Sequence, residues 1–198
     1  MKRLTLGLSA SLLLLCAGAA HATIITYAAP LNGASEDPRN DSTASGETVV
    51  TIDDVTNMMT VNASFSGLRE PTTASHIHCC TLLPFAGRAG VATSLPTFPA
   101  FPIGVQAGDY TETFDLMKSA TYNPAFLTSN GNSLDAARLA FLAGLASGRA
   151  YLNIHTTAFP GGEIRGFLVD VPEPASIALF SLGAAGLAAL RRRPPARA

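Results

Sequence analysis

Residues 47–53 read Glu47-Thr48-Val49-Val50-Thr51-Ile52-Asp53, and residues 59–65 read Met59-Thr60-Val61-Asn62-Ala63-Ser64-Phe65. Both stretches alternate with a period of two residues, as expected when one face of a β-strand is buried. Alternation places Val50 and Ile52 on one face of the first stretch and Val49 and Thr51 on the other. Asp53-Asp54 and Asn57 lie between the stretches and are typical turn residues. The segment therefore predicts a β-hairpin.

Further short strands are predicted on both sides of this hairpin, over residues 24–28, 74–79, 110–116, 150–156 and 163–169. Residues 84–102 contain four prolines and therefore predict a long loop rather than a central strand. One helix is predicted to begin after an N-cap at Ser133 and to stop at Gly148. About seven short strands separated by turns favour a mainly β fold. We expect an antiparallel β-sandwich, immunoglobulin-like or superoxide-dismutase-like, with one short helix.

Both ends of the chain carry targeting patterns. Lys2 and Arg3 precede apolar residues 4–20, and Ala20-His21-Ala22 fits the cleavage site of a secretory signal peptide. Near the other end, Pro172-Glu173-Pro174 is followed by apolar residues 175–190 and by Arg191-Arg192-Arg193. As a helix this apolar run spans about 24 Å, slightly less than a bilayer core of roughly 30 Å. The predicted organisation is a signal peptide (1–22), one domain (23–170) and a hydrophobic helical tail (171–198).

The tail resembles the PEP-CTERM sorting signal of Gram-negative bacteria in its Pro-Glu-Pro triplet, hydrophobic span and terminal arginines. The resemblance implies an exosortase-type membrane protease that processes the tail and passes the protein to the cell surface or extracellular matrix. It also implies transient or stable anchoring in the inner membrane, with the arginines on the cytoplasmic side. An ordinary tail anchor and a terminal core helix are the alternatives, and neither explains the Pro-Glu-Pro triplet.

The domain between these signals is acidic. Residues 23–170 contain seven basic and thirteen acidic residues, a net charge of −6, which argues against nucleic acid as a partner. The chain has no G-x-S-x-G elbow, H-E-x-x-H zinc motif, P-loop or G-x-G-x-x-G motif. These observations favour a non-enzymatic binding or structural role.

Three histidines are the candidate site. Alternation places His76 and His78 on the face opposite Ile77, with Cys80 on the same face, and it separates His155 from Leu152 and Ile154. If the strands are neighbours, His76, His78 and His155 converge into a ligand set for zinc or copper, with Cys80 as the natural fourth ligand. The alternative is that the histidines are structural and bond to loop backbone or to Glu163. Glu163 and Arg165 themselves predict a charge pair beside a turn.

Cys79 and Cys80 are the two cysteines of the mature domain. Consecutive Cα atoms lie about 3.8 Å apart, less than the roughly 4.4–6.8 Å of most disulfides. A vicinal disulfide, a bridge to another chain and metal ligation are therefore three alternatives, and the sequence does not decide between them.

Several segments together resemble the CHRD domain, a module named after chordin and common in exported bacterial proteins. They are Leu31-Asn32-Gly33-Ala34-Ser35-Glu36-Asp37-Pro38, Phe65-Ser66-Gly67-Leu68 before Ser75-His76-Ile77-His78, and the closing segments 149–156 and 161–166. The resemblance covers residues 25–169, although the common form has Gly-Pro where this chain has Cys79-Cys80. It implies a β-sandwich and no settled activity.

Taken together, these patterns predict an exported, non-enzymatic module of the bacterial cell surface or extracellular matrix. The expected partners are an exosortase-type protease, the membrane through the tail, and a surface or matrix polymer. The alternative is a copper- or zinc-dependent redox enzyme, or a metal-binding protein, that uses His76, His78 and His155.

Overall fold

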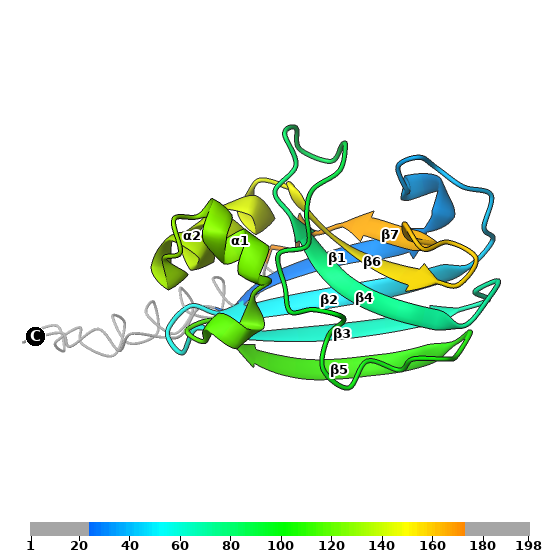
Figure 1. The fold of residues 1–198 in the computed structure, drawn as a ribbon, viewed down its shortest axis with the longest axis horizontal. Coiled ribbons are helices and arrows are strands. Elements are labelled where there is room, and N and C mark those ends of the chain that lie inside the picture. Colours follow the sequence, from blue (N-terminus) through cyan, green and yellow to red (C-terminus); the bar gives the residue numbers. More distant parts are fainter. Residues whose placement is uncertain (1–23, 173–198) are drawn as a thin grey trace, which may run out of the picture.

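Antiparallel strands dominate the protein in this computed structural model, which describes residues 24–172 (Figure 1). They form one eight-stranded sheet in the order β4-β6-β7-β1-β2-β3-β5, with β8 paired to β1. The predicted mainly β, antiparallel fold is thereby confirmed. The strands are β1 (Ile24–Asn32), β2 (Ser45–Asp53), β3 (Met58–Ser66), β4 (Thr72–Cys79), β5 (Gly108–Asp115), β6 (Ala150–Thr156), β7 (Ile164–Phe167) and β8 (Val169–Asp170).

The hairpin expected from the sequence is β2 and β3, paired from Ser45 opposite Ser66 to Asp53 opposite Met58. The Asp53 carboxylate closes the turn by accepting hydrogen bonds from the backbone N–H groups of Val55 and Thr56, both at 2.9 Å. Asn57 ends the turn with a φ of 57°, a left-handed conformation that Asn tolerates better than most residues. Local side-chain chemistry thus fixes the register of this pair.

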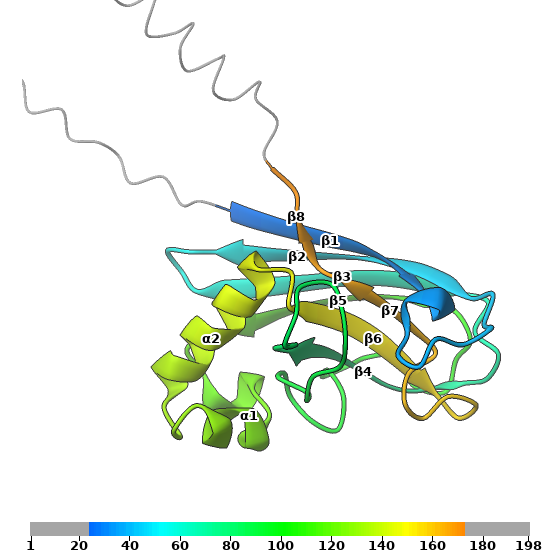
Figure 2. The ribbon, with the colours of Figure 1, turned by 90° about the horizontal axis from the view of Figure 1, so that it is seen from above.

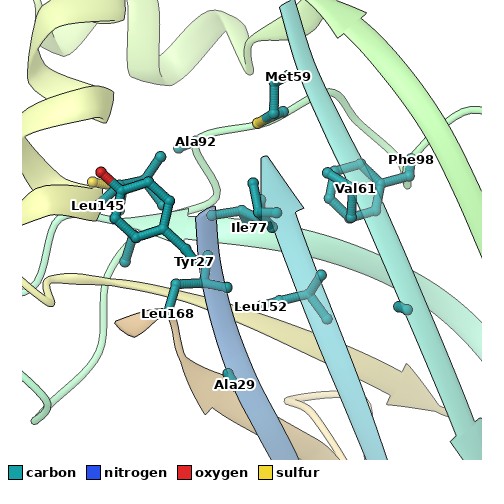
Figure 3. Packing of buried hydrophobic residues seen from close by; sticks show 14 of the residues in the cluster. Tyr27, Ala29, Met59, Val61, Ile77, Ala92, Phe98, Leu145, Leu152 and Leu168 are labelled. Atoms are coloured by element: carbon teal, nitrogen blue, oxygen red, sulfur yellow. The ribbon is translucent and has the colours of Figure 1, made fainter. Parts of the chain in front are cut away.

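The sheet curls into a half-barrel, so that β4 and β6 lie across the core from β2 and β3 (Figure 2). The two layers expected of a sandwich are therefore two parts of one continuous sheet. Inward-facing side chains from both parts meet in the core (Figure 3), among them Val61 of β3, Ile77 of β4 and Leu152 of β6, each fully buried. On β2 the alternation holds as predicted, with Val50 fully buried and Val49 37% exposed.

Residues 80–107, between β4 and β5, run along the free edge of β4. The N–H groups of Ala92 and Phe98 donate to the carbonyl oxygens of Ile77 and Ser75, both at 3.0 Å. Phe98 is fully buried and stacks on Tyr110 of β5, with ring centroids 5.6 Å apart. The proline-rich loop predicted from the sequence thus spans the opening of the half-barrel between its two edge strands.

Two α-helices pack at one end of the sheet (Figure 2). Helix α2 (Leu134–Ala146) begins after Ser133, whose hydroxyl accepts from the Ala136 N–H as predicted for an N-cap. Helix α1 (Pro124–Ser129) was not expected from the sequence, and it begins after the capping side chain of Asn123. Two short 3-10 helices, η1 (Gly33–Ser35) and η2 (Ser119–Thr121), complete the elements.

Within residues 24–172, no helix has both the length and the apolar character needed to cross a membrane. The predicted signal peptide with its Ala20 and Ala22 cleavage site, and the hydrophobic run 175–190 with its arginines, lie outside the described residues.

Candidate functional site

The three histidines lie on the face of β4 and β6 that points away from the core. In the paired register His76 lies opposite Asn153, His78 opposite Tyr151, and Ala74 opposite His155. This outer face is nevertheless covered, because His76 is only 5% exposed and His78 only 9%. The loops before β5 and before β7 shield it from solvent and supply its hydrogen-bond partners.

The structure brings the three rings together. The ring centroid of His155 lies 5.3 Å from that of His76 and 6.1 Å from that of His78, and the remaining pair is 5.9 Å apart. One nitrogen from each ring belongs to a group whose members all lie within 4.8 Å of one another. Imidazole nitrogens at this spacing need only small side-chain shifts to share one ion at about 2.0–2.1 Å each.

The other nitrogen of each ring is bonded to a loop carbonyl. His76 Nε2 lies 2.6 Å from the oxygen of Pro96, His78 Nδ1 2.9 Å from that of Ala89, and His155 Nδ1 2.9 Å from that of Pro160. A carbonyl oxygen can only accept, so each of these ring nitrogens carries the hydrogen and donates it. The backbone bonds expected of structural histidines are present, but they occupy one nitrogen per ring, and none involves Glu163.

The tautomers fixed in this way leave three lone pairs without a partner. His76 Nδ1, His78 Nε2 and His155 Nε2 are buried and have no hydrogen-bond partner among the described residues. Buried polar atoms are nearly always satisfied in folded proteins, so three orphaned nitrogens in one cluster require an explanation.

The cluster is electrically neutral around pH 7. Burial lowers the pKa of His78 from 6.5 to about 4, and the bond to Ala89 opposes this only in part. Burial also lowers the pKa of His76 and of His155. All three rings therefore present lone pairs rather than positive charges, which is the state in which imidazole ligates a metal.

Tyr151 holds His78 in place. The two rings stack with centroids 4.8 Å apart and planes 5° from parallel, and the Tyr151 hydroxyl accepts from the Ala89 N–H at 3.3 Å. The guanidinium carbon of Arg165 lies 4.6 Å from the Tyr151 ring centroid on the same sheet face. The Arg165–Tyr151–His78 arrangement gives the cluster a rigid support.

Cys80 does not join the histidines. It forms a disulfide with Cys79, and its Sγ lies 3.5 Å from the carbonyl oxygen of Ala140 in helix α2. Strand β4 ends at Cys79, so the alternation that would have placed Cys80 beside His78 no longer applies there. Of the three alternatives for these cysteines, the structure has the vicinal disulfide.

The polar face also contains two groups whose roles the sequence did not reveal. Glu163 is fully buried, and its carboxylate accepts from Ser42 Oγ at 2.6 Å, from the Arg69 N–H at 2.8 Å and from Thr156 Oγ1 at 2.7 Å. Arg165 forms its ion pair with Glu36, Nε to Oε2 at 3.7 Å, rather than with Glu163. The Glu36–Arg165 ion pair forms because β7 pairs with β1, with Arg165 opposite Asn32. This strand pairing could not be read from the sequence alone.

Two family models match the chain. A family model described as the CHRD domain matches residues 27–168, and one described as the PEP-CTERM protein-sorting motif matches residues 170–193. The second range includes the Pro172-Glu173-Pro174 triplet and the Arg191-Arg192-Arg193 cluster, so the tail marks an exported protein anchored at the membrane or cell surface. No curated protein and no solved structure matches the chain. The CHRD model covers most of the chain, including all three clustered histidines, and the protein is therefore a member of the CHRD domain family that carries a PEP-CTERM sorting signal.

Proposed function

We propose that this protein is a non-enzymatic module that binds one copper or zinc ion through His76, His78 and His155. An exosortase-type protease would process the tail and deliver the module to the cell surface or extracellular matrix. Two observations carry the metal proposal: one nitrogen from each of the three rings lies within 4.8 Å of the others, and each ring has one buried nitrogen without a hydrogen-bond partner among the described residues.

An ion accounts for features that structural histidines leave unexplained. A buried nitrogen without a partner costs about 1–3 kcal/mol, and three such atoms would add up to a large penalty in one place. In metal sites, a ligating imidazole usually donates its second N–H to a carbonyl or carboxylate, which fixes the ring and its tautomer. All three rings here donate to carbonyl oxygens.

The donor set suits copper or zinc, both of which accept imidazole. Three neutral ligands leave a fourth position, and a depression lined by Thr73, His76, His155, Thr157 and Pro160 reaches this side of the cluster. A metal bound there would act as a Lewis acid or as an electron carrier. The chain's own contribution is to hold three neutral imidazole rings close together and to keep most of the cluster away from water.

The same depression supports a second candidate function, a metal-dependent redox enzyme, because small molecules could reach the open position. Binding without turnover is favoured because the cluster found among the described residues contains histidines alone, with no carboxylate among its ligand atoms to move protons. A matrix polymer remains the proposed partner of the module as a whole.

The test uses the fact that every histidine of residues 24–172 belongs to this cluster. Imidazole nitrogens labelled with ¹⁵N therefore report on the site alone during a titration with zinc or copper(I). We expect His76 Nδ1, His78 Nε2 and His155 Nε2 to shift together and to saturate near one equivalent. Protein purified without a histidine tag should also retain metal by elemental analysis, and less than about a tenth of an equivalent, with no shift on titration, would refute the proposal.

The metal-loaded protein should also be assayed for superoxide dismutation and substrate oxidation. An activity that is lost in the His78→Gln variant would favour the redox enzyme over the binding module. Mass spectrometry of the mature C-terminus from the native host tests the sorting step, because exosortase processing predicts a terminus upstream of the arginine cluster.

A further inference from the structure

We propose that a second cavity, between residues 36–40 and the loop 158–162, binds an acidic sugar unit. Its volume is about 320 Å³, at the small end of the roughly 300–1,000 Å³ typical of ligand pockets. The cavity is separate from the histidine cluster. Its walls are formed by Glu36, Asp37, Pro38, Arg39, Asn40, Arg88, Ala158, Phe159, Pro160, Gly161 and Gly162.

Glu36 provides a buried acceptor in this cavity. Its side chain is only 5% exposed, and Oε2 lies 3.7 Å from the Nε of Arg165. Its other oxygen, Oε1, is buried and has no hydrogen-bond partner among the described residues. A ligand that donates a hydrogen bond, such as a sugar hydroxyl, would satisfy this oxygen once the packing over it shifts slightly, and would remove the penalty of leaving it unpaired.

Gly162 packs closely against this acceptor. A Cβ atom at Gly162 would lie 2.6 Å from Glu36 Oε1 and 2.6 Å from Asn153 Nδ2, too close for either. The φ of Gly162 is 126°, a backbone conformation that side chains rarely allow. Only a residue without a side chain therefore fits at this position between Glu36 and Asn153.

Two arginines form the outer part of the cavity. Arg39 and Arg88 are both exposed, and neither makes an ion pair within residues 24–172, although the domain as a whole is acidic. Guanidinium groups bind carboxylates through paired, charge-assisted hydrogen bonds. The ligand that fits this arrangement carries a carboxylate toward the arginines and a hydroxyl toward Glu36.

The remaining wall is apolar. Phe159 is half-buried, with the guanidinium carbon of Arg69 5.5 Å from its ring centroid, and Arg69 does not line the cavity. Pro38 and Pro160 add further apolar surface. A pyranose ring of a uronic acid combines an apolar C–H face, hydroxyl donors and one carboxylate. A ligand with a positive charge would pair only with Glu36. Arg39, Arg88 and the buried Arg165 would repel it.

The test uses the full chain in detergent micelles and three probes, namely trigalacturonic acid, the neutral trisaccharide maltotriose and triglutamate. Isothermal titration calorimetry should detect saturable binding of trigalacturonic acid and at least tenfold weaker binding of the other two. The Arg39→Gln/Arg88→Gln double variant changes only exposed side chains, and it should weaken trigalacturonic acid binding by about tenfold or more. Phe159→Ala should weaken it as well.

Lys118→Gln is the matched control, since it removes one exposed positive charge beside Asp115, outside the cavity. It should leave the affinity unchanged. The proposal is overturned if trigalacturonic acid does not bind the folded protein, or if the double arginine variant binds it as well as the parent. Equal binding of triglutamate would assign the cavity to an acidic peptide instead, and equal binding of maltotriose would exclude the role given to the arginines.

Discussion

The Nδ1–H of His155 donates to the carbonyl oxygen of Pro160 at 2.9 Å, and Pro160 lies between two cavities. On one side Pro160 lines the depression next to His76 and His155, and on the other it lines the cavity above Glu36. The same residue thus fixes the tautomer of a candidate metal ligand and forms a wall of the proposed sugar site. The loop before β7 is the structural connection between the two.

Replacing His78 with Gln should abolish stabilisation by metal. Ligand at about 100 times its Kd raises the free energy of unfolding of the parent protein by roughly 2.7 kcal/mol. The variant lacks one of the three imidazole rings of the cluster and should show little of this gain in thermal unfolding with and without zinc. Glu47→Gln, an exposed change on β2, should keep the full gain. A normal zinc response of His78→Gln would mean that the ion binds elsewhere.

Replacing Glu36 with Gln should change how stability depends on pH. Burial raises the pKa of Glu36 from 4.5 to about 7, and the Arg165 charge opposes this shift. The folded state therefore holds this proton more tightly than the unfolded state, and stability from this group is present below pH 4.5 and lost as pH rises through 7. Gln does not ionise, so the variant should gain stability relative to the parent across that window. The gain is on the order of 3 kcal/mol, at about 1.4 kcal/mol per pKa unit.

Denaturant unfolding of the parent and of Glu36→Gln at several pH values between 4 and 8 measures the difference in their free energies of unfolding. The contributions of all other titrating groups cancel in this difference. Glu47→Gln again serves as the exposed control and should run parallel to the parent. A constant difference between Glu36→Gln and the parent over the whole range would show that Glu36 titrates normally.

Alternation explains which parts of the molecule were predictable. Period-two patterns separated the two faces of each strand, because successive side chains point to opposite sides. The structure shows that the faces with Val50, Ile77 and Leu152 form the core. The same pattern put His76 and His78 on one face. The approach of His155 depended on the pairing of β4 with β6, strands that are far apart in sequence, and the sequence offered it only as a condition taken from the expected sandwich.

The sequence could not predict which distant strands pair or at which residue each strand ends. The Glu36–Arg165 ion pair depends on β7 lying next to β1, which also joins the two expected layers into one sheet. Cys80 was misplaced as a ligand because β4 stops one residue earlier. Helix α1 is six residues long, too short for a helical period to be recognised, although Asn123-Pro124 is a good N-terminal signal.

Adding a methyl group at Gly144 should destabilise the protein through the disulfide. A Cβ at this position in α2 would lie 2.6 Å from Cys80 Sγ and still closer to Cys79 Sγ. Overpacking of this kind typically costs about 1–3 kcal/mol, and here it opposes the gain of about 1 kcal/mol that Ala brings to a helix interior. Gly161→Ala, where nothing lies within 4 Å, is the control and should be nearly neutral.

A double-mutant cycle identifies the cause of this loss. In a Cys79→Ala/Cys80→Ala background the sulfur atoms are absent, so Gly144→Ala should cost much less, and the coupling should be at least about 0.5 kcal/mol. An equal penalty in both backgrounds would place the clash elsewhere in the packing of α2.

Truncation should separate the folded domain from its anchor at a sharp boundary. Strand β8 pairs with β1, Asp170 opposite Tyr27, and the Val171 N–H donates to Thr26 O at 2.8 Å. Removing residues 172–198 keeps these contacts, so the protein should be released in soluble form with a cooperative unfolding transition. Removing residues 168–198 also deletes the fully buried Leu168, and loss of such a side chain costs about 2–5 kcal/mol even when only truncated to Ala. Membrane fractionation measures release, and thermal unfolding measures the stability of each truncated protein. Membrane retention of the protein that ends at residue 171, or equal stability of the proteins that end at residues 167 and 171, would contradict this boundary.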